Sequence, residues 1–338
     1  MVILLLCAFS LGVFANPSTD FLEKAYAIDG EGSFAERYAA LLLAQEAYEA
    51  LDEAQKQSVS EAYAQVMAER EELAALAVKA EAFIARAASL ADCTSIMDKV
   101  RIFDEAYAPD RYFGDESYPG IKAAKEEFEK IKKKRDDTVS FIILVDELLT
   151  EREGFAYVAE NYFAIKELLD KASALYPLID MGYSGATGAA ADYGAINAEV
   201  IGAEQHTEGV IELIEVINAK TDYASKKSLV ASLERDINSE DFIIEYEGAE
   251  ASIAALAVIK DYFSECEAQA QNYIVAVEAI GGAESRFAAI CAAISIRASV
   301  DGTVGGVSST DGTLEAIVKD YNSFVALANA ALLGISAD

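Results

Sequence analysis

Apolar and polar positions follow one another along this chain at steps of three and four residues, the spacing that places side chains on one face of a helix. In the clearest stretch, 118–149, two apolar runs with this spacing lie on either side of a wholly charged segment, Lys132 to Asp137. The pattern predicts one long helix that contributes to two separate cores. Its apolar positions are Ile121, Ala124, Phe128 and Ile131 before the charged segment, and Ile142, Val145 and Leu149 after it.

A longer pattern repeats along the chain: an aromatic residue or Val, then Leu or Ile, then another Ile or Leu six positions further on. We call these positions the anchors. Successive copies are 62, 58, 69 and 63 residues apart, and a degenerate sixth copy begins at Phe324-Val325. The five anchors are Phe21-Leu22 with Ile28, Phe83-Ile84 with Leu90, Phe141-Ile142 with Leu148, Val210-Ile211 with Ile217, and Tyr273-Ile274 with Ile280.

The same order of elements is predicted after each anchor: helix A, a break, helix B, a loop, and helix C, which runs into the next anchor. Gly can end a helix in the left-handed conformation, and Asp, Ser or Thr can cap the next one. Ser33 and Glu36 have the spacing of a capping box. We predict breaks at Asp29-Gly30, Asp92, 150–154, 218–222 and Gly281-Gly282, helix B at 96–107, 155–169, 225–233 and 287–296, and helix C after Gly120, Gly194, Gly248 and Gly312.

These patterns predict an all-α fold of tandem three-helix-bundle repeats joined by long shared helices, in an elongated chain. Abundant alanine and only four prolines favour helices over strands. The alternative is one large bundle, in which an Ala-rich amphipathic pattern recurs by chance. The predicted repeats are 20–82, 83–140, 141–209, 210–272 and 273–323, and 324–338 is the start of a truncated or degenerate repeat.

The N-terminus carries an apolar run, residues 2–14, that is short for a membrane span. Val13-Phe14-Ala15 fits a small-residue cleavage site, so we expect 1–15 to be a secretory signal peptide and the protein to be extracellular or on the cell surface. A buried or membrane-anchoring N-terminus is the alternative, because a basic n-region is missing.

Three cysteines follow this segment, Cys93, Cys266 and Cys291, without CxxC or any other metal-like spacing. Each lies among apolar residues at helical spacing, so we expect buried free thiols. A disulfide between Cys266 and Cys291 is the alternative if the chain is exported.

The net charge of −31 would repel a phosphate backbone and anionic lipid headgroups alike. We therefore expect no nucleic-acid partner and no membrane insertion beyond the signal segment. The one basic run, Lys132 to Arg135, is followed directly by Asp136 and Asp137, and we expect it to be a solvated helix face.

Catalytic and metal-binding patterns are scarce. His206 is the only histidine, which excludes triads and multi-histidine metal sites within the chain, and we expect it to be exposed and incidental. The segment 182–188 lacks the Lys-Ser/Thr ending of a phosphate loop, and 301–312 lacks the final Glu of an EF-hand loop. We therefore expect no catalytic, cofactor-binding or metal-binding residue, no cofactor, and a protein that is not an enzyme.

The chain has 17 tyrosines and no tryptophan, and several of its aromatic residues lie in predicted loops. Tyrosine combines apolar area with a polar tip, which suits contact with a glycan or a protein. Packing of these residues against the end of a bundle is the alternative. The candidate contact residues are Tyr112, Phe113, Tyr183, Tyr193 and Tyr246.

Residues 47–59, AYEALDEAQKQSV, resemble a phrase common in helical repeats of large bacterial cell-surface proteins, including those found beside FIVAR-type modules. The resemblance implies a non-catalytic spacer or adhesive module and transfers no functional residue. Together, these features predict an exported structural or interaction protein, a helical spacer or adhesive array on the cell surface. A glycan- or protein-binding module that uses the loop tyrosines is the alternative.

Overall fold

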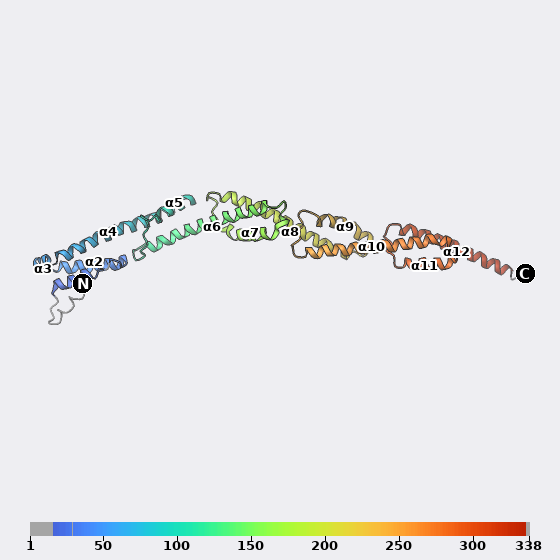
Figure 1. The fold of residues 1–338 in the computed structure, drawn as a ribbon, viewed down its shortest axis with the longest axis horizontal. Coiled ribbons are helices and arrows are strands. Elements are labelled where there is room, and N and C mark those ends of the chain that lie inside the picture. Colours follow the sequence, from blue (N-terminus) through green and yellow to red (C-terminus); the bar gives the residue numbers. More distant parts are fainter. Residues whose placement is uncertain (1–15, 29, 336–338) are drawn as a thin grey trace. The chain divides into compact units, whose positions relative to one another are not determined.

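The computed structural model describes residues 16–28 and 30–335, and side chains as far as residue 333. The expected signal peptide, 1–15, lies outside the described residues. Figure 1 shows helices throughout, and no strand occurs in the described ranges, which confirms the prediction of an all-α fold. The α-helices are α1 (Pro17–Tyr26), α2 (Phe34–Glu49), α3 (Glu53–Ser58), α4 (Ser60–Ser89), α5 (Ile96–Ala106), α6 (Ile121–Glu153), α7 (Tyr162–Leu175), α8 (Ala186–Ala219), α9 (Tyr223–Ile237), α10 (Ala249–Ala279), α11 (Arg286–Arg297) and α12 (Val307–Ile335).

Within the described residues, four short 3₁₀ helices separate some of these elements: η1 (Leu90–Asp92), η2 (Val158–Asn161), η3 (Tyr176–Leu178) and η4 (Ile280–Gly282). The chain divides into two compact units. One contains 1–143 and 173–190, and the other contains 144–172 and 191–338. Each unit is described by itself below.

The first unit has two apolar cores. One joins Phe21 of α1, Leu41 of α2 and Leu73 of α4, and the other joins Phe83 of α4, Phe103 of α5 and Phe128 of α6. Helix α4 contributes to both cores, because its apolar stripe continues past the end of the first bundle. A single helix therefore serves two cores within this unit.

The second unit also has two cores. One joins Leu148, Ile165, Val200 and Ile243, which lie on α6, α7, α8 and the segment before α10. The other is larger and runs from Val210 on α8 to Leu314 on α12. Helix α10 has buried residues along its whole length, from Ala249 to Val277.

The polar stretches predicted inside long helices are helical. Helices α6, α8 and α10 continue unbroken through Lys132 to Asp137, Glu204 to Gly209 and Glu265 to Asn272, respectively. Good helix formers and the absence of proline account for this continuity in α6 and α10. Helix α8 continues although Gly209 costs about 1 kcal/mol relative to Ala in a helix interior. The capping box of Ser33 and Glu36 is also present at the start of α2.

Several predicted boundaries are wrong. Helix α8 begins after Gly185 and not after Gly194, and α12 begins after Gly306 and not after Gly312. The break at 150–154 is also misplaced, because α6 continues to Glu153. The predicted helix B at 155–169 begins only at 162 and is preceded by η2.

The loops that precede the long helices α6, α8, α10 and α12 share one backbone geometry. Four loops, 115–120, 180–185, 243–248 and 301–306, end in a glycine with φ between 87° and 92°, and we call them the glycine loops. In each loop the fourth residue donates its N–H to the carbonyl of the first, and the residue after the glycine donates its N–H to the carbonyl of the fourth. The four glycines are Gly120, Gly185, Gly248 and Gly306.

The glycine loops pack on the predicted anchors. A Cβ atom added to each glycine would lie 3.1–3.6 Å from the Cδ1 atom of the second anchor residue of the same unit. Both the left-handed backbone and this close approach favour glycine. The four anchor partners are Ile84, Ile142, Ile211 and Ile274.

Candidate interaction surfaces

Two glycine loops cap helices that lie far away in the sequence. The N–H groups of Phe34 and Ala35 at the start of α2 donate to Asp115 Oδ2, at 2.5 Å, and to Ser117 Oγ, at 3.0 Å. Because the first N–H groups of a helix have no partner within the helix, these bonds satisfy otherwise orphaned donors. Loop 115–120 therefore fixes the start of α2 in the first unit.

The second unit contains the same contact. The N–H groups of Tyr223 and Ala224 at the start of α9 donate to Asp301 Oδ2, at 2.7 Å, and to Thr303 Oγ1, at 3.1 Å. The sequence pattern did not predict this role of Asp301; the segment 301–312 was compared only with an EF-hand loop, whose final Glu it lacks. The shared signal is an Asp followed two residues later by Ser or Thr and five residues later by the left-handed glycine.

The carboxylates of both loops have lowered pKa values. Burial alone would raise the pKa of Asp301, but hydrogen bonds from Thr303 and from the Tyr223 N–H, together with the charge of Arg297, hold this pKa below its usual value. The pKa of Asp115 is lowered in the same way, since bonds from Phe34 and Ser117 outweigh its burial. Both groups therefore stay ionised at neutral pH.

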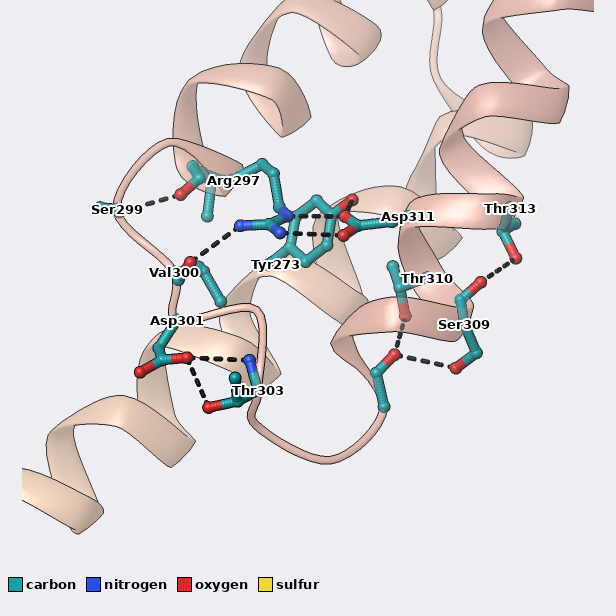
Figure 2. Close-up of polar contacts among 12 residues, drawn as sticks. Tyr273, Arg297, Ser299, Val300, Asp301, Thr303, Ser309, Thr310, Asp311 and Thr313 are labelled. Atoms are coloured by element: carbon teal, nitrogen blue, oxygen red, sulfur yellow. Dashed lines mark hydrogen bonds and ion pairs between the residues drawn. The ribbon is translucent and has the colours of Figure 1, made fainter. Parts of the chain in front are cut away.

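Figure 2 shows a polar cluster beside loop 301–306. The Arg297 Nε and Nη2 atoms donate to the two carboxylate oxygens of Asp311, at 2.6 and 2.9 Å, and Nη1 donates to the Val300 carbonyl. The Tyr273 hydroxyl donates to Asp311 Oδ1 at 2.7 Å. Burial and this bond raise the pKa of Tyr273 to about 12. The cluster is internally paired, so it ties α10, α11 and α12 together around the loop.

The charged stretches of the long helices bind a neighbouring helix. Arg135 Nη1 of α6 contacts Asp104 of α5 at 3.2 Å, so the predicted solvated face of Lys132 to Arg135 is only partly correct. Glu204 of α8 accepts a bond from the Tyr162 hydroxyl and pairs with Lys166. In the first copy, Arg37 of α2 is buried and forms ion pairs with Glu69 and Glu72 of α4. In the second unit, Glu267 of α10 accepts a hydrogen bond from the Tyr223 hydroxyl and forms an ion pair with Lys227, both on α9.

Two buried threonines bind the other two glycine loops. Thr138 Oγ1 donates to the carbonyl of Lys134 and accepts the N–H of Asp180, at 3.0 Å. Thr207 Oγ1 donates to the carbonyl of Ala203 and accepts the N–H of Ile243, also at 3.0 Å. Each threonine lies three positions before an anchor. Nothing in the periodicity of the sequence distinguished these two residues.

The predicted contact residues do not form one cluster. Tyr112, Phe113 and Tyr183 belong to the first unit, whereas Tyr193 and Tyr246 belong to the second. Phe113 is 6% exposed and packs in the core with Phe83, so it offers almost no surface to a partner.

The three tyrosines other than Tyr112 are half-buried. The Tyr246 hydroxyl donates to Glu208 at 2.5 Å, and this bond raises the pKa of Tyr246 to about 12. For Tyr112, Tyr183, Tyr193 and Tyr246, contact with a partner stays a prediction.

Tyr112 is 38% exposed and lies beside a groove of about 770 Å³ in the first unit. Its ring stacks on Tyr107 with centroids 5.1 Å apart, and Lys125 Nζ lies 5.9 Å from the centroid of Tyr112. The groove also carries charges of both signs. Its other lining residues are Glu116, Lys122, Glu126, Glu129, Lys130 and Lys133.

Two expectations about single residues are wrong. Cys291 is exposed and Cys93 is half-buried, so only Cys266 is the buried thiol that the sequence predicts, and all three are free. His206 is half-buried, and its Nε2 atom lies 2.9 Å from the carbonyl oxygen of Asp236. The histidine therefore links α8 to α9.

The described ranges contain no group of three or more His, Cys, Asp or Glu side chains that could hold a metal ion. Within these ranges, no helix combines the length and the apolar content that a membrane span requires.

No protein-family model, no curated protein and no solved structure matches the chain. The phrase at 47–59 includes the turn between α2 and α3, where Asp52 and Gln55 form a capping box. Its resemblance to repeats of bacterial cell-surface proteins stays a prediction.

Proposed function

We propose that this protein is an exported, non-catalytic structural or interaction protein, a helical spacer or adhesive array built from tandem three-helix repeats. In the first repeat helix A is α1. Each later repeat takes helix A from the end of one long helix and helix C from the start of the next, with helix B packed between them. In such an array each repeat contacts mainly its neighbours, and length grows with repeat number.

The observation that carries this proposal is the recurrence of the glycine loop. Gly120, Gly185, Gly248 and Gly306 follow one another at intervals of 65, 63 and 58 residues, each with the same loop hydrogen bonds and an anchor isoleucine beside it. A chance recurrence of amphipathic helices would repeat the apolar stripe, but it would not repeat a left-handed glycine at a fixed place against an anchor.

Small-angle X-ray scattering of residues 16–338 tests the spacer function. The proposal predicts an extended particle whose cross-section is that of one three-helix bundle. A compact, near-spherical particle would contradict both the array and the spacer role. A spacer must be long enough to separate the molecules attached to its two ends, and a globule of this size is not.

Export is tested separately. Residues 1–20 fused to a reporter enzyme that is active only after secretion should deliver it outside the cell, and replacement of the apolar residues Leu4, Leu5 and Leu6 by Asp should abolish delivery. Retention of the unaltered fusion inside the cell would refute the exported part of the proposal while leaving the array untouched.

Binding of a glycan or protein is the second candidate function, and the groove beside Tyr112 favours it. An exposed tyrosine stacked on a second ring with a lysine nearby suits a flat sugar face or an aromatic side chain. On a glycan array, Tyr112→Ala should lose any signal of the unaltered protein, whereas Tyr26→Ala should keep it. Tyr26 is a matched control, because it is exposed and lies in the same unit. Equal binding by both variants would exclude this groove.

A further inference from the structure

The cap at the start of helix α2 comes from two places in the sequence. The N-cap residue Ser33 accepts the N–H of Glu36, the third residue of the helix. The N–H groups of the first two residues, Phe34 and Ala35, donate instead to loop 115–120, which begins 81 residues after Phe34. One helix cap is therefore shared between two distant segments of the chain.

Helix α9 divides its cap in the same way. Its N-cap residue Asp222 accepts the N–H of Ser225, and the N–H groups of the two residues between them donate to loop 301–306. In α2 and in α9, the helix's own N-cap satisfies the third N–H group and the loop satisfies the first two. Since four N–H groups at a helix start have no partner within the helix, the loop provides most of the cap.

Helix α5 begins without such help, although a glycine loop lies beside it. A Cβ atom added to Gly182 of loop 180–185 would lie 3.5 Å from Cγ2 of Ile96, the first residue of α5. Gly182 takes the place of the Ser or Thr in the two capping loops and has no hydroxyl. The Asp180 carboxylate accepts the N–H of Gly182 in its own loop, and among the described residues no hydrogen bond joins this loop to α5.

The long helices carry a matching difference. Thr138 and Thr207 accept loop N–H groups where the loop does not cap a helix. In the helices beside the two capping loops, the same position, three residues before the anchor, is occupied by Ala80 and Ala270. Both alanines are buried, and their side chains offer no acceptor. A loop is thus held by a threonine of the long helix, or it holds the start of another helix through its own Asp and Ser or Thr.

We propose that the shared cap couples the folding of neighbouring repeats at the two junctions that have one. Loop 115–120 of the second repeat completes helix B of the first, and loop 301–306 of the fifth repeat completes helix B of the fourth. Where a threonine holds the loop, as at 180–185, the start of helix B does not depend on the loop. The assignment to repeats rests on the array proposed above, whereas the coupling is measured between elements of one unit.

Hydrogen exchange on Asp115→Ala and Asp180→Ala tests this coupling. Both substitutions remove the bond from the N–H two residues later, but only Asp115 also accepts an N–H from another helix. In Asp115→Ala the amides of 38–44 in α2 should exchange at least about fivefold faster, the effect of losing a helix cap. In Asp180→Ala, the matched control, the amides of 100–106 in α5 should exchange as in the unaltered protein.

The second unit supplies an independent variant, because Asp301→Ala should accelerate exchange in α9 by a similar factor. Unchanged exchange of α2 in Asp115→Ala, unchanged exchange of α9 in Asp301→Ala, or equal acceleration of α5 in Asp180→Ala would each overturn the proposal. A compact particle in the scattering experiment would refute the array without altering the expected exchange, since α2, α5 and both of their loops belong to the first unit.

Discussion

Gly185 and Gly188 lie three residues apart, yet their substitutions should have opposite effects. Gly185 has a φ of +87°, so Ala there pays the left-handed penalty of about 1–2 kcal/mol. Gly188 lies inside α8 with open space around it, and Gly188→Ala should stabilise the first unit by up to about 1 kcal/mol. Urea unfolding of both variants measures the difference. Equal signs would show that the φ value at Gly185 is not what requires glycine.

Thr207 offers a second test at the scale of single residues. Thr207→Val keeps the shape but leaves the Ile243 N–H without its acceptor, which should cost about 1–3 kcal/mol. Exchange of the Ile243 amide should then accelerate. Thr207→Ser retains the hydroxyl and should keep this amide protected while losing only one methyl group. Equal acceleration in both variants would mean that the hydroxyl is not the acceptor that matters.

Glycine also marks where sequence reasoning reached its limit. The segment 182–194 contains four glycines, and helix propensity alone placed the helix start at the last of them, Gly194. The left-handed residue is Gly185, which is identified by its place two residues after Tyr183 and five after Asp180. That signal appears only when the four loops are aligned with one another, since any one loop is too short to be distinctive.

At the scale of elements, the contact between loop 301–306 and the start of α9 should depend on pH. The pKa of Asp301 is lower in the folded protein than in the unfolded chain, where it is about 3.9. Its stabilising effect is therefore fully present above the unfolded pKa and is lost as pH falls through the folded pKa. Urea midpoints of the second unit should fall between about pH 5 and pH 3.

Asp301→Asn is the control for this effect, because Asn keeps an oxygen acceptor and removes the charge. This variant should have a lower midpoint at pH 7 and a shallower decline in acid. The Arg297–Asp311 pair should retain part of the decline, since the pKa of Asp311 is also lowered. An unchanged pH profile in Asp301→Asn would show that the carboxylate does not stabilise the start of α9.

Elements were predicted better than their boundaries. The long helices follow from apolar periodicity on both sides of charged, proline-free segments such as Lys132 to Asp137. The break expected at 150–154 failed because Thr150 remains helical and its hydroxyl bonds the carbonyl of Asp146 four residues earlier. The exposed Cys291 was missed for a related reason: α11 is apolar on more than one side, so its stripe does not define which face is buried.

At the scale of the whole molecule, a repeat array and a single bundle differ in how far a local change in stability spreads along the chain. In a quasi-one-dimensional array, damage to one repeat weakens that repeat and its neighbours and leaves distant repeats intact. A single cooperative bundle would instead distribute the loss over the entire chain. The two cases differ in where hydrogen exchange accelerates, which bulk unfolding curves do not resolve.

The most direct test is hydrogen exchange on Phe141→Ala. Phe141 is fully buried, and its truncation should cost about 3–5 kcal/mol. Lys133→Ala on the same helix changes an exposed side chain and should leave protection unchanged. The account predicts that Phe141→Ala loses protection in α6 and in the helices packed around Phe141, while residues 39–49 of α2 exchange as in the unaltered protein. Equal loss of protection in α2 would show a single cooperative domain and would contradict the repeat array.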